Sequence, residues 1–179
     1  EIKTAIPTVA STIHRLLGAM PNRAEFRHNQ DNPLHLDLLV VDEASMVDLP
    51  LMFKLILALP EHARLILLGD KDQLSSVEAG AVLGDICSFI DVGYSTEQND
   101  ILSSLTGYQS LPMSQQKNPI ADCLCMLKKS YRFDENSGIG QLAKEINRGD
   151  IYGVDRVLKQ GYKDIQYNIL TSESYSLLI

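Results

Sequence analysis

The stretch LLVVDEASMVD, residues 38–48, decides the fold of this 179-residue chain. It opens with a short, uninterrupted apolar run, Leu38–Val41, which ends in β-branched residues. A run of this length and composition is typical of a strand buried on both faces of a parallel sheet. A second run of the same kind, residues 65–68, follows after a helical pattern. The spacing therefore predicts a strand–helix–strand unit with a right-handed crossover.

Helices are expected on either side of the first strand. The helix before it should begin after Pro7, with Thr8 as its N-cap, and end at Pro21. Its apolar positions repeat at helical spacing: Val9, Ile13, Leu16, Leu17 and Met20. The crossover helix should lie between Asp48, which can cap it, and Pro60. Together these elements predict an α/β fold with a parallel sheet flanked by helices.

The rest of the chain is predicted to be mainly helical. Helices are expected over about 80–90, 97–106 and 120–129, and from Ser137 to Gly149. Residues 91–118 are rich in polar residues and are interpreted as an insertion, and residues 130–133 as a short strand or turn. The tail, 150–179, is expected to form a helix, a short strand over 165–167 and the start of another helix. This pattern assigns residues 1–135 to one α/β domain and 136–179 to a helical segment that leads into a following region.

Composition narrows the class of protein. The chain has 16 basic and 23 acidic residues, a formal net charge of −7, which argues against a free-standing basic nucleic-acid binder but permits a local DNA groove. Three cysteines cannot form a disulfide framework, and no apolar run approaches the roughly 20 residues that span a bilayer. We therefore predict a cytoplasmic protein with reduced thiols and no membrane partner. The ends of the chain, Glu1 and an apolar run up to Ile179, are those expected of a piece of a longer protein.

Acidic residues follow both predicted strands. Asp42 and Glu43 follow the first strand, and Asp70 follows the second, after Gly69, which is expected to permit the turn. Ligands of open parallel sheets bind beyond the carboxyl ends of the strands. An Asp there suits a hard cation such as Mg²⁺, an adjacent Glu can act as a general base, and Gln73 can hydrogen-bond a phosphate or water. The alternative is that these residues only begin polar turns.

Four segments together resemble superfamily 1 helicases. Residues 38–48 look like helicase motif II, the Walker B strand, and residues 65–80, LILLGDKDQLSSVEAG, look like motif III. The stretch TIHRLLG, residues 12–18, resembles the segment after motif Ia, and SYRF, residues 130–133, resembles motif IV. Over roughly residues 8–165 the combination is similar to the RecD-like helicases, the family that supplies the alpha subunit of bacterial RecBCD (exodeoxyribonuclease V).

The resemblance implies a RecA-like, P-loop NTPase fold and a role for each matching residue. Asp42 would bind the Mg²⁺ of Mg-ATP and Glu43 would activate the hydrolytic water. Gln73 would sense the γ-phosphate, Asp70 would support that loop, and Arg132 would act as an arginine finger. Guanidinium suits that role because it stays charged and donates in a planar fork.

The resemblance also implies DNA and protein partners. Thr12 and His14 match positions near a single-stranded DNA path, although an ordinary solvated helix face would look the same. The family works as a 5′-to-3′, ATP-dependent DNA helicase in double-strand-break repair and recombination, beside RecB- and RecC-like subunits.

One expected motif is missing. The chain contains no G-x-x-x-x-G-K-[ST] run, which cradles the phosphates of ATP. We therefore expect a RecA-like lobe truncated at both ends, inactive by itself. A non-catalytic RecA-like scaffold subunit remains the alternative, and a P-loop ATPase without a DNA role is a third interpretation.

Overall fold

The computed structural model describes residues 9–70, 82–109, 111–127, 131 and 137–167. The positions expected to act as γ-phosphate sensor and arginine finger, Gln73 and Arg132, lie outside these ranges. The chain divides into two compact units, Glu1–Cys125 and Met126–Ile179, which are described separately below.

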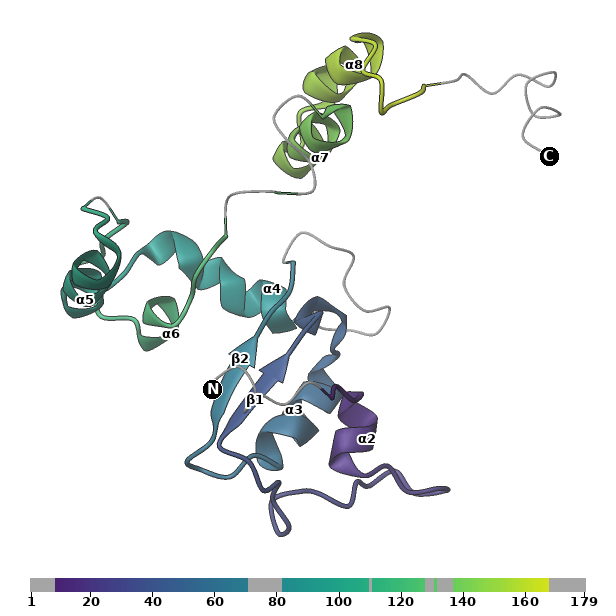
Figure 1. Cartoon of the computed structure of the whole chain (residues 1–179), viewed down its shortest axis with the longest axis vertical. Helices are drawn as coiled ribbons and strands as arrows, with labels where there is room; N and C mark the ends of the chain where they lie inside the picture. The colour runs from purple at the N-terminus through teal and green to yellow at the C-terminus, as the bar shows by residue number, and fades with distance from the viewer. Residues whose placement is uncertain (1–8, 71–81, 110, 128–130, 132–136, 168–179) are drawn as a thin grey trace, which may run out of the picture. The chain divides into compact units, whose positions relative to one another are not determined.

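The strand–helix–strand unit forms as predicted, and with it the α/β fold class is confirmed (Figure 1). Strands β1 (Leu38–Val41) and β2 (Arg64–Leu67) pair in parallel, with Leu38 opposite Arg64 and Val41 opposite Leu67. The crossover helix is α3 (Leu49–Leu57). Asp48 caps it as expected, because its Oδ1 accepts the Leu51 N–H at 2.7 Å. The sheet has two strands in the described part of the chain.

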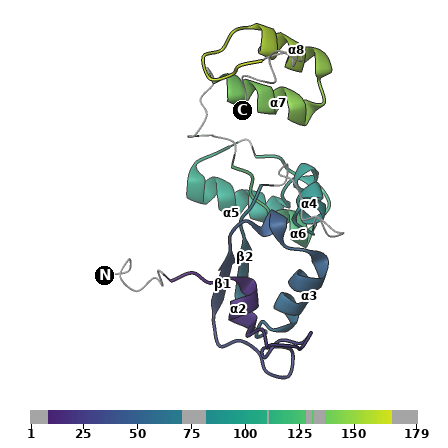
Figure 2. The ribbon, with the colours of Figure 1, turned by 90° about the vertical axis from the view of Figure 1, so that its right-hand side faces the viewer.

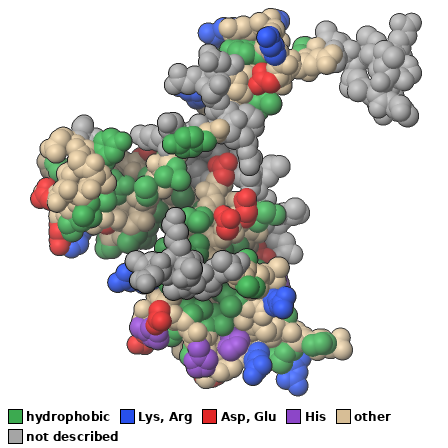
Figure 3. Space-filling view, in the orientation of Figure 1, with side chains coloured by type: hydrophobic (Ala, Val, Ile, Leu, Met, Phe, Trp, Pro, Cys, Tyr) green, Lys and Arg blue, Asp and Glu red, His purple; other side chains and the backbone are tan. Residues whose placement is uncertain are grey.

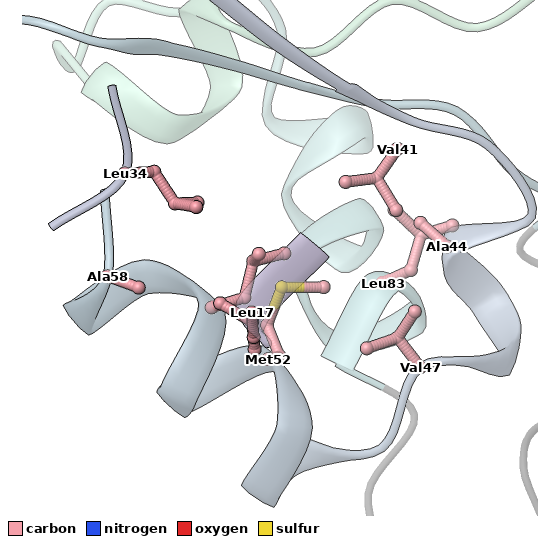
Figure 4. Close-up of a cluster of buried hydrophobic side chains, with 9 residues drawn as sticks. Leu17, Leu34, Val41, Ala44, Val47, Met52, Ala58 and Leu83 are labelled. Carbon is pink, nitrogen blue, oxygen red and sulfur yellow. The ribbon is translucent and has the colours of Figure 1, made fainter. Parts of the chain in front are cut away.

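An apolar cluster lies between the strands and the helices of this unit (Figure 4). Leu17, Met52 and Leu55 are its most enclosed large side chains, each with at most 1% of its surface exposed. The remaining members come from the strand ends, the turns and α4: Leu34, Val41, Ala44, Val47, Ala58 and Leu83. Helices α2 and α3 lie on the same side of the strands, so this cluster fills one face of the sheet (Figure 2).

The other face of the sheet differs from the expectation. Leu38 and Val40 are each 51% exposed and Ile66 is 44% exposed, whereas Val41 is buried. The prediction of strands buried on both faces is therefore wrong for the described residues. Side chains alternate across a strand, and among those residues the helices cover one face alone.

Helix α2 (Ile13–Leu17) is shorter than predicted. Thr12 caps it, since its hydroxyl accepts the Arg15 N–H at 3.3 Å, and Gly18 ends it in the left-handed region at φ +73°. Thr12 begins the helix and Gly18 ends it, so both bounds lie inside the apolar pattern that runs from Val9 to Met20. Thr8, the cap expected from the sequence, lies outside the described residues.

The polar segment after β2 carries further helices. They are α4 (Val82–Cys87), the 3₁₀ turn η2 (Ser88–Val92), α5 (Thr96–Thr106) and α6 (Pro119–Asp122). The predicted helix over 97–106 is confirmed as α5, whereas the one over 120–129 ends at Asp122 within the described residues. Ser95 and Asp122 join the two ends of this segment: the carboxylate of Asp122 accepts the Ser95 N–H at 2.7 Å and the Ser95 hydroxyl at 2.8 Å.

The second unit is a helical hairpin. Helix α7 (Gly138–Arg148) has the predicted caps, Ser137 and Gly149, and packs against α8 (Ile151–Lys159). Its predicted apolar face is partly exposed, and Ile146 on that face has 58% of its surface exposed to solvent. The short strand expected over 165–167 does not form, and these residues are irregular backbone. No helix in the described ranges is long and apolar enough to cross a membrane.

Candidate functional site

The ends of β1 and β2 meet at one edge of the sheet. The ladder continues one step past the strands: Leu68 N donates to Val41 O, and Ala44 N donates to Leu68 O, both at 2.8 Å. Asp42 and Glu43, which follow β1, therefore lie at the same edge of the sheet as Gly69 and Asp70, which follow β2. The three acidic side chains are exposed to solvent. The structure thus brings together Asp42, Glu43 and Asp70 as the sequence predicted, at the edge where ligands of parallel sheets bind.

Glu43 adopts an unusual backbone conformation. Its φ of +53° and ψ of +40° place it in the left-handed region, where a non-glycine residue costs roughly 1–2 kcal/mol. The 3₁₀ turn η1 (Ala44–Met46) begins directly after it. Such strain persists where the surrounding structure fixes it, and it concentrates at functional sites. Sequence reasoning did not foresee this feature, since no Gly or Asn marks the position.

Asp42 has the chemistry of a magnesium ligand. Its Oδ1 accepts the Glu43 N–H at 2.9 Å, and a carboxylate has about four lone-pair positions, so this bond leaves room for a hydrated cation. Mg²⁺ in nucleotide sites is bound by one or two carboxylates together with substrate phosphates. Within the described ranges, no group of three or more His, Cys, Asp or Glu side chains could enclose a metal by itself. The residues present fit a cation shared with a nucleotide.

The turn after Glu43 is enclosed by its neighbours. Ala44 and Ser45 are buried, and the Ser45 hydroxyl has no hydrogen-bond partner among the residues that the structure describes. An orphaned buried hydroxyl costs about 1–3 kcal/mol. The burial of this turn therefore leaves one polar group, the Ser45 hydroxyl, without a hydrogen bond.

The predicted DNA-contacting residues lie on α2 and beside it. Both Thr12 and His14 are exposed, and Thr12 is occupied in capping. The His14 ring meets Phe26 edge-on, with centroids 5.6 Å apart, and Lys54 Nζ lies 5.2 Å from the centroid of the same Phe26 ring. Lys54 also donates to Ala24 O at 3.1 Å, which ties this loop to α3.

The loop after α2 adds basic groups that the sequence analysis did not single out. It folds back on the helix, because Arg27 N donates to Gly18 O at 3.1 Å and His28 N donates to Leu17 O at 2.9 Å. Figure 3 shows His and Lys or Arg side chains gathered at the end of the unit that carries α2 and this loop. The signal available in the sequence was the run FRHN, residues 26–29, which combines an aromatic residue with basic ones.

The parallel strand–helix–strand unit with acids at its carboxyl edge fits a class of protein, the P-loop NTPases, of which it would be a partial domain. A family model described as "AAA domain" matches residues 1–79. "RecBCD enzyme subunit RecD" of Haemophilus influenzae is 49% identical over 169 residues, which is 94% of this chain and 26% of that protein. The protein of the same name from Buchnera aphidicola (subspecies Acyrthosiphon pisum) is 35% identical over 180 residues, 99% of this chain and 30% of the relative.

A third relative matches over a shorter stretch. "ATP-dependent RecD2 DNA helicase" of Deinococcus radiodurans is 53% identical over 74 residues, 41% of this chain and 10% of that protein. The chain is similar to RecD proteins over most of its own length. It spans 26% and 30% of the length of the two RecD relatives described above.

Proposed function

We propose that this chain belongs to an ATP-dependent DNA helicase subunit and supplies Asp42 and Glu43 to its ATP-hydrolysing centre. One observation carries the proposal: both strands of the parallel unit deliver acids to one edge, where Glu43 is held in a strained conformation. The name of the D. radiodurans relative supports ATP-dependent helicase activity. The activity belongs to the longer protein that contains a phosphate-binding loop, because the 179 residues contain no such run. By itself the chain does not hydrolyse ATP appreciably.

The residues divide the chemistry between them. Bound Mg-ATP supplies the reacting γ-phosphoryl group and a cation that neutralises its charge. Asp42 would hold that cation, and the Glu43 carboxylate would take a proton from the attacking water. Gln73 senses the γ-phosphate and Asp70 supports its loop. Arg132 donates to the phosphoryl oxygens, a contribution worth about 10³–10⁵ in rate in other nucleotide hydrolases.

Hydrolysis is coupled to movement on DNA. Thr12 and His14 face single-stranded DNA, where a hydroxyl and an imidazole can contact phosphate or stack on a base. Translocation runs 5′ to 3′, in a cytoplasmic heterotrimer with RecB- and RecC-like subunits that processes double-strand breaks for repair and recombination. The names of the relatives from H. influenzae and B. aphidicola, each a RecBCD enzyme subunit, support this assembly.

A scaffold subunit without catalysis is the second candidate. The absence of the phosphate-binding run from these 179 residues keeps this alternative open. The retained pair Asp42 and Glu43, with Gln73 and Arg132, weighs against it.

The test uses the full-length gene product assembled with its partner subunits. Glu43→Gln should lower the kcat of DNA-stimulated ATP hydrolysis by about 10²–10⁴-fold while nucleotide binding persists, because the carboxylate base is lost and the fold is not. Glu61→Gln, at an exposed position in the turn before β2, is the matched control and should keep the wild-type rate. Duplexes with a 5′ or a 3′ single-stranded tail report the polarity. A wild-type assembly without DNA-stimulated hydrolysis would favour the scaffold.

A further inference from the structure

Gly69 lies where three elements meet. It follows β2, faces the turn that leads into η1, and contacts α4 through Leu83. Its backbone is outside the left-handed region, so Gly69 does not permit the turn through a positive φ. Another physical reason must account for a residue without a side chain at this position.

The reason is the space around its Cα. A β-carbon placed on Gly69 would lie 2.7 Å from Leu83 Cδ2, 3.1 Å from Ser45 N and 3.2 Å from Ala44 N. Ordinary van der Waals contacts of a β-carbon lie at 3.4–4 Å. A leucine methyl group can rotate away, but the two amide nitrogens belong to the backbone. Any larger residue must therefore displace the chain that follows Glu43.

That part of the chain is fixed on both sides of the acidic pair. Val41, before the pair, accepts the Leu68 N–H, and Ala44, after it, donates to Leu68 O, both at 2.8 Å. The strained backbone of Glu43 is thus held between two hydrogen bonds to one residue at the end of β2. Gly69, the next residue, determines how closely this turn approaches.

We propose that Gly69 is a positioning residue for Glu43. Its bare Cα lets the turn containing Asp42 and Glu43 close onto the end of β2, and this closure sets the direction of the Glu43 carboxylate. The inference rests on the proposed function, in which Glu43 is the general base. A β-carbon at Gly69 moves the Ala44 and Ser45 amides by a few tenths of an ångström and turns that carboxylate away from the attacking water.

The test measures ATP hydrolysis by the full-length gene product in its assembly with partner subunits. Gly69→Ala should lower kcat about tenfold and Gly69→Val by more, because small misplacements of a catalytic group cost up to about 10²-fold. The KM for ATP should stay within about twofold, since the change affects the orientation of the base rather than the affinity for nucleotide. Wild-type kcat in both variants would contradict the proposal.

A double-mutant cycle separates positioning from loss of packing. Leu83→Val relieves the 2.7 Å overlap and leaves the two amide contacts in place. In the Leu83→Val background, Gly69→Ala should therefore destabilise the protein less, while the loss of kcat stays the same. If kcat recovers together with thermal stability, the defect lies in the packing of α4 and the positioning role is wrong.

Glu43→Gln distinguishes this inference from the function on which it rests. If that variant hydrolyses ATP at the wild-type rate, the proposed function fails. If it is inactive while both Gly69 variants keep full kcat, the positioning role alone fails.

Discussion

The two units of the chain are stabilised in different ways. In Glu1–Cys125 the strands and helices enclose large apolar side chains, of which Leu55 is fully buried. In the described part of Met126–Ile179 three residues are buried, and two of them are glycines: Gly138, Gly153 and Val157. The first unit therefore depends on apolar burial, and the second on close backbone contacts and polar caps.

The caps of the hairpin show this dependence most clearly. The Asp164 carboxylate accepts three hydrogen bonds at the start of α7: from the Ser137 hydroxyl at 2.8 Å, from Gly138 N at 3.0 Å and from Ile139 N at 3.1 Å. These bonds satisfy donors that the first turn of a helix leaves free. A negative charge at this end also interacts favourably with the helix dipole. One side chain thus joins the segment after α8 to the beginning of α7.

The largest expected effect is in the apolar unit. Leu55→Ala should reduce the free energy of unfolding by about 3 kcal/mol, because it removes a fully buried side chain from the cluster and leaves a cavity. Its neighbour in α3, Ile56, is 53% exposed, so Ile56→Ala should cost well under half as much. Hydrogen exchange of the α3 amides in the 179-residue chain measures both. Equal losses would mean that apolar burial does not dominate this unit.

The next effect is in the hairpin and compares two glycines. A β-carbon at Gly138 would lie 2.5 Å from Tyr162 Cβ, close to the backbone, whereas at Gly153 it would meet the carboxylate ends of Glu145 and Asp150. Side-chain ends can swing aside and a Cβ cannot. Gly138→Ala should therefore destabilise the hairpin by about 1–3 kcal/mol, and Gly153→Ala by clearly less. Exchange protection of the α7 and α8 amides reports both, and the reverse order would contradict this account.

Local sequence signals predicted the elements that local chemistry controls. The strands were visible as apolar runs, and the caps Asp48 and Ser137 were visible because their side chains bond within three residues. The short length of α2 was missed because Thr12 begins the helix and Gly18 ends it inside a longer apolar pattern. The exposed sheet face was missed for another reason: the pattern of Leu38 and Val40 records that they are apolar, not what covers them.

The candidate site also has features that the sequence predicts and features that depend on contacts between distant segments. The placement of Asp42, Glu43 and Asp70 at one edge follows from parallel strands, so the sequence was sufficient for it. The left-handed backbone of Glu43 and the crowding at Gly69 depend on contacts between η1, β2 and α4, which are far apart along the chain. The roles of Gln73 and Arg132 stay predictions, as do the DNA contacts of Thr12 and His14.

The smallest expected effect is a pH dependence confined to the hairpin. The backbone hydrogen bond from Ile139, followed by those from Ser137 and Gly138, lowers the pKa of Asp164. A carboxyl whose pKa is lower in the folded state stabilises the fold above its unfolded pKa, about 3.9, and loses that contribution as the pH falls through the lowered value. Because Asp164 is exposed to solvent, this contribution is smaller than the packing effects above.

Asp164→Asn should therefore weaken the hairpin at pH 7, and its difference from the wild type should shrink as the pH falls through the lowered pKa of Asp164. The measurement is exchange protection of the α7 amides, corrected for the intrinsic pH dependence of exchange. Asp155→Asn is the control, because it removes an exposed pair in which Lys159 Nζ donates to Asp155 Oδ2 and leaves the α7 cap intact. If Asp164→Asn matches the wild type at pH 7, the cap does not hold the hairpin, and the contrast between the two units must come from the glycine contacts alone.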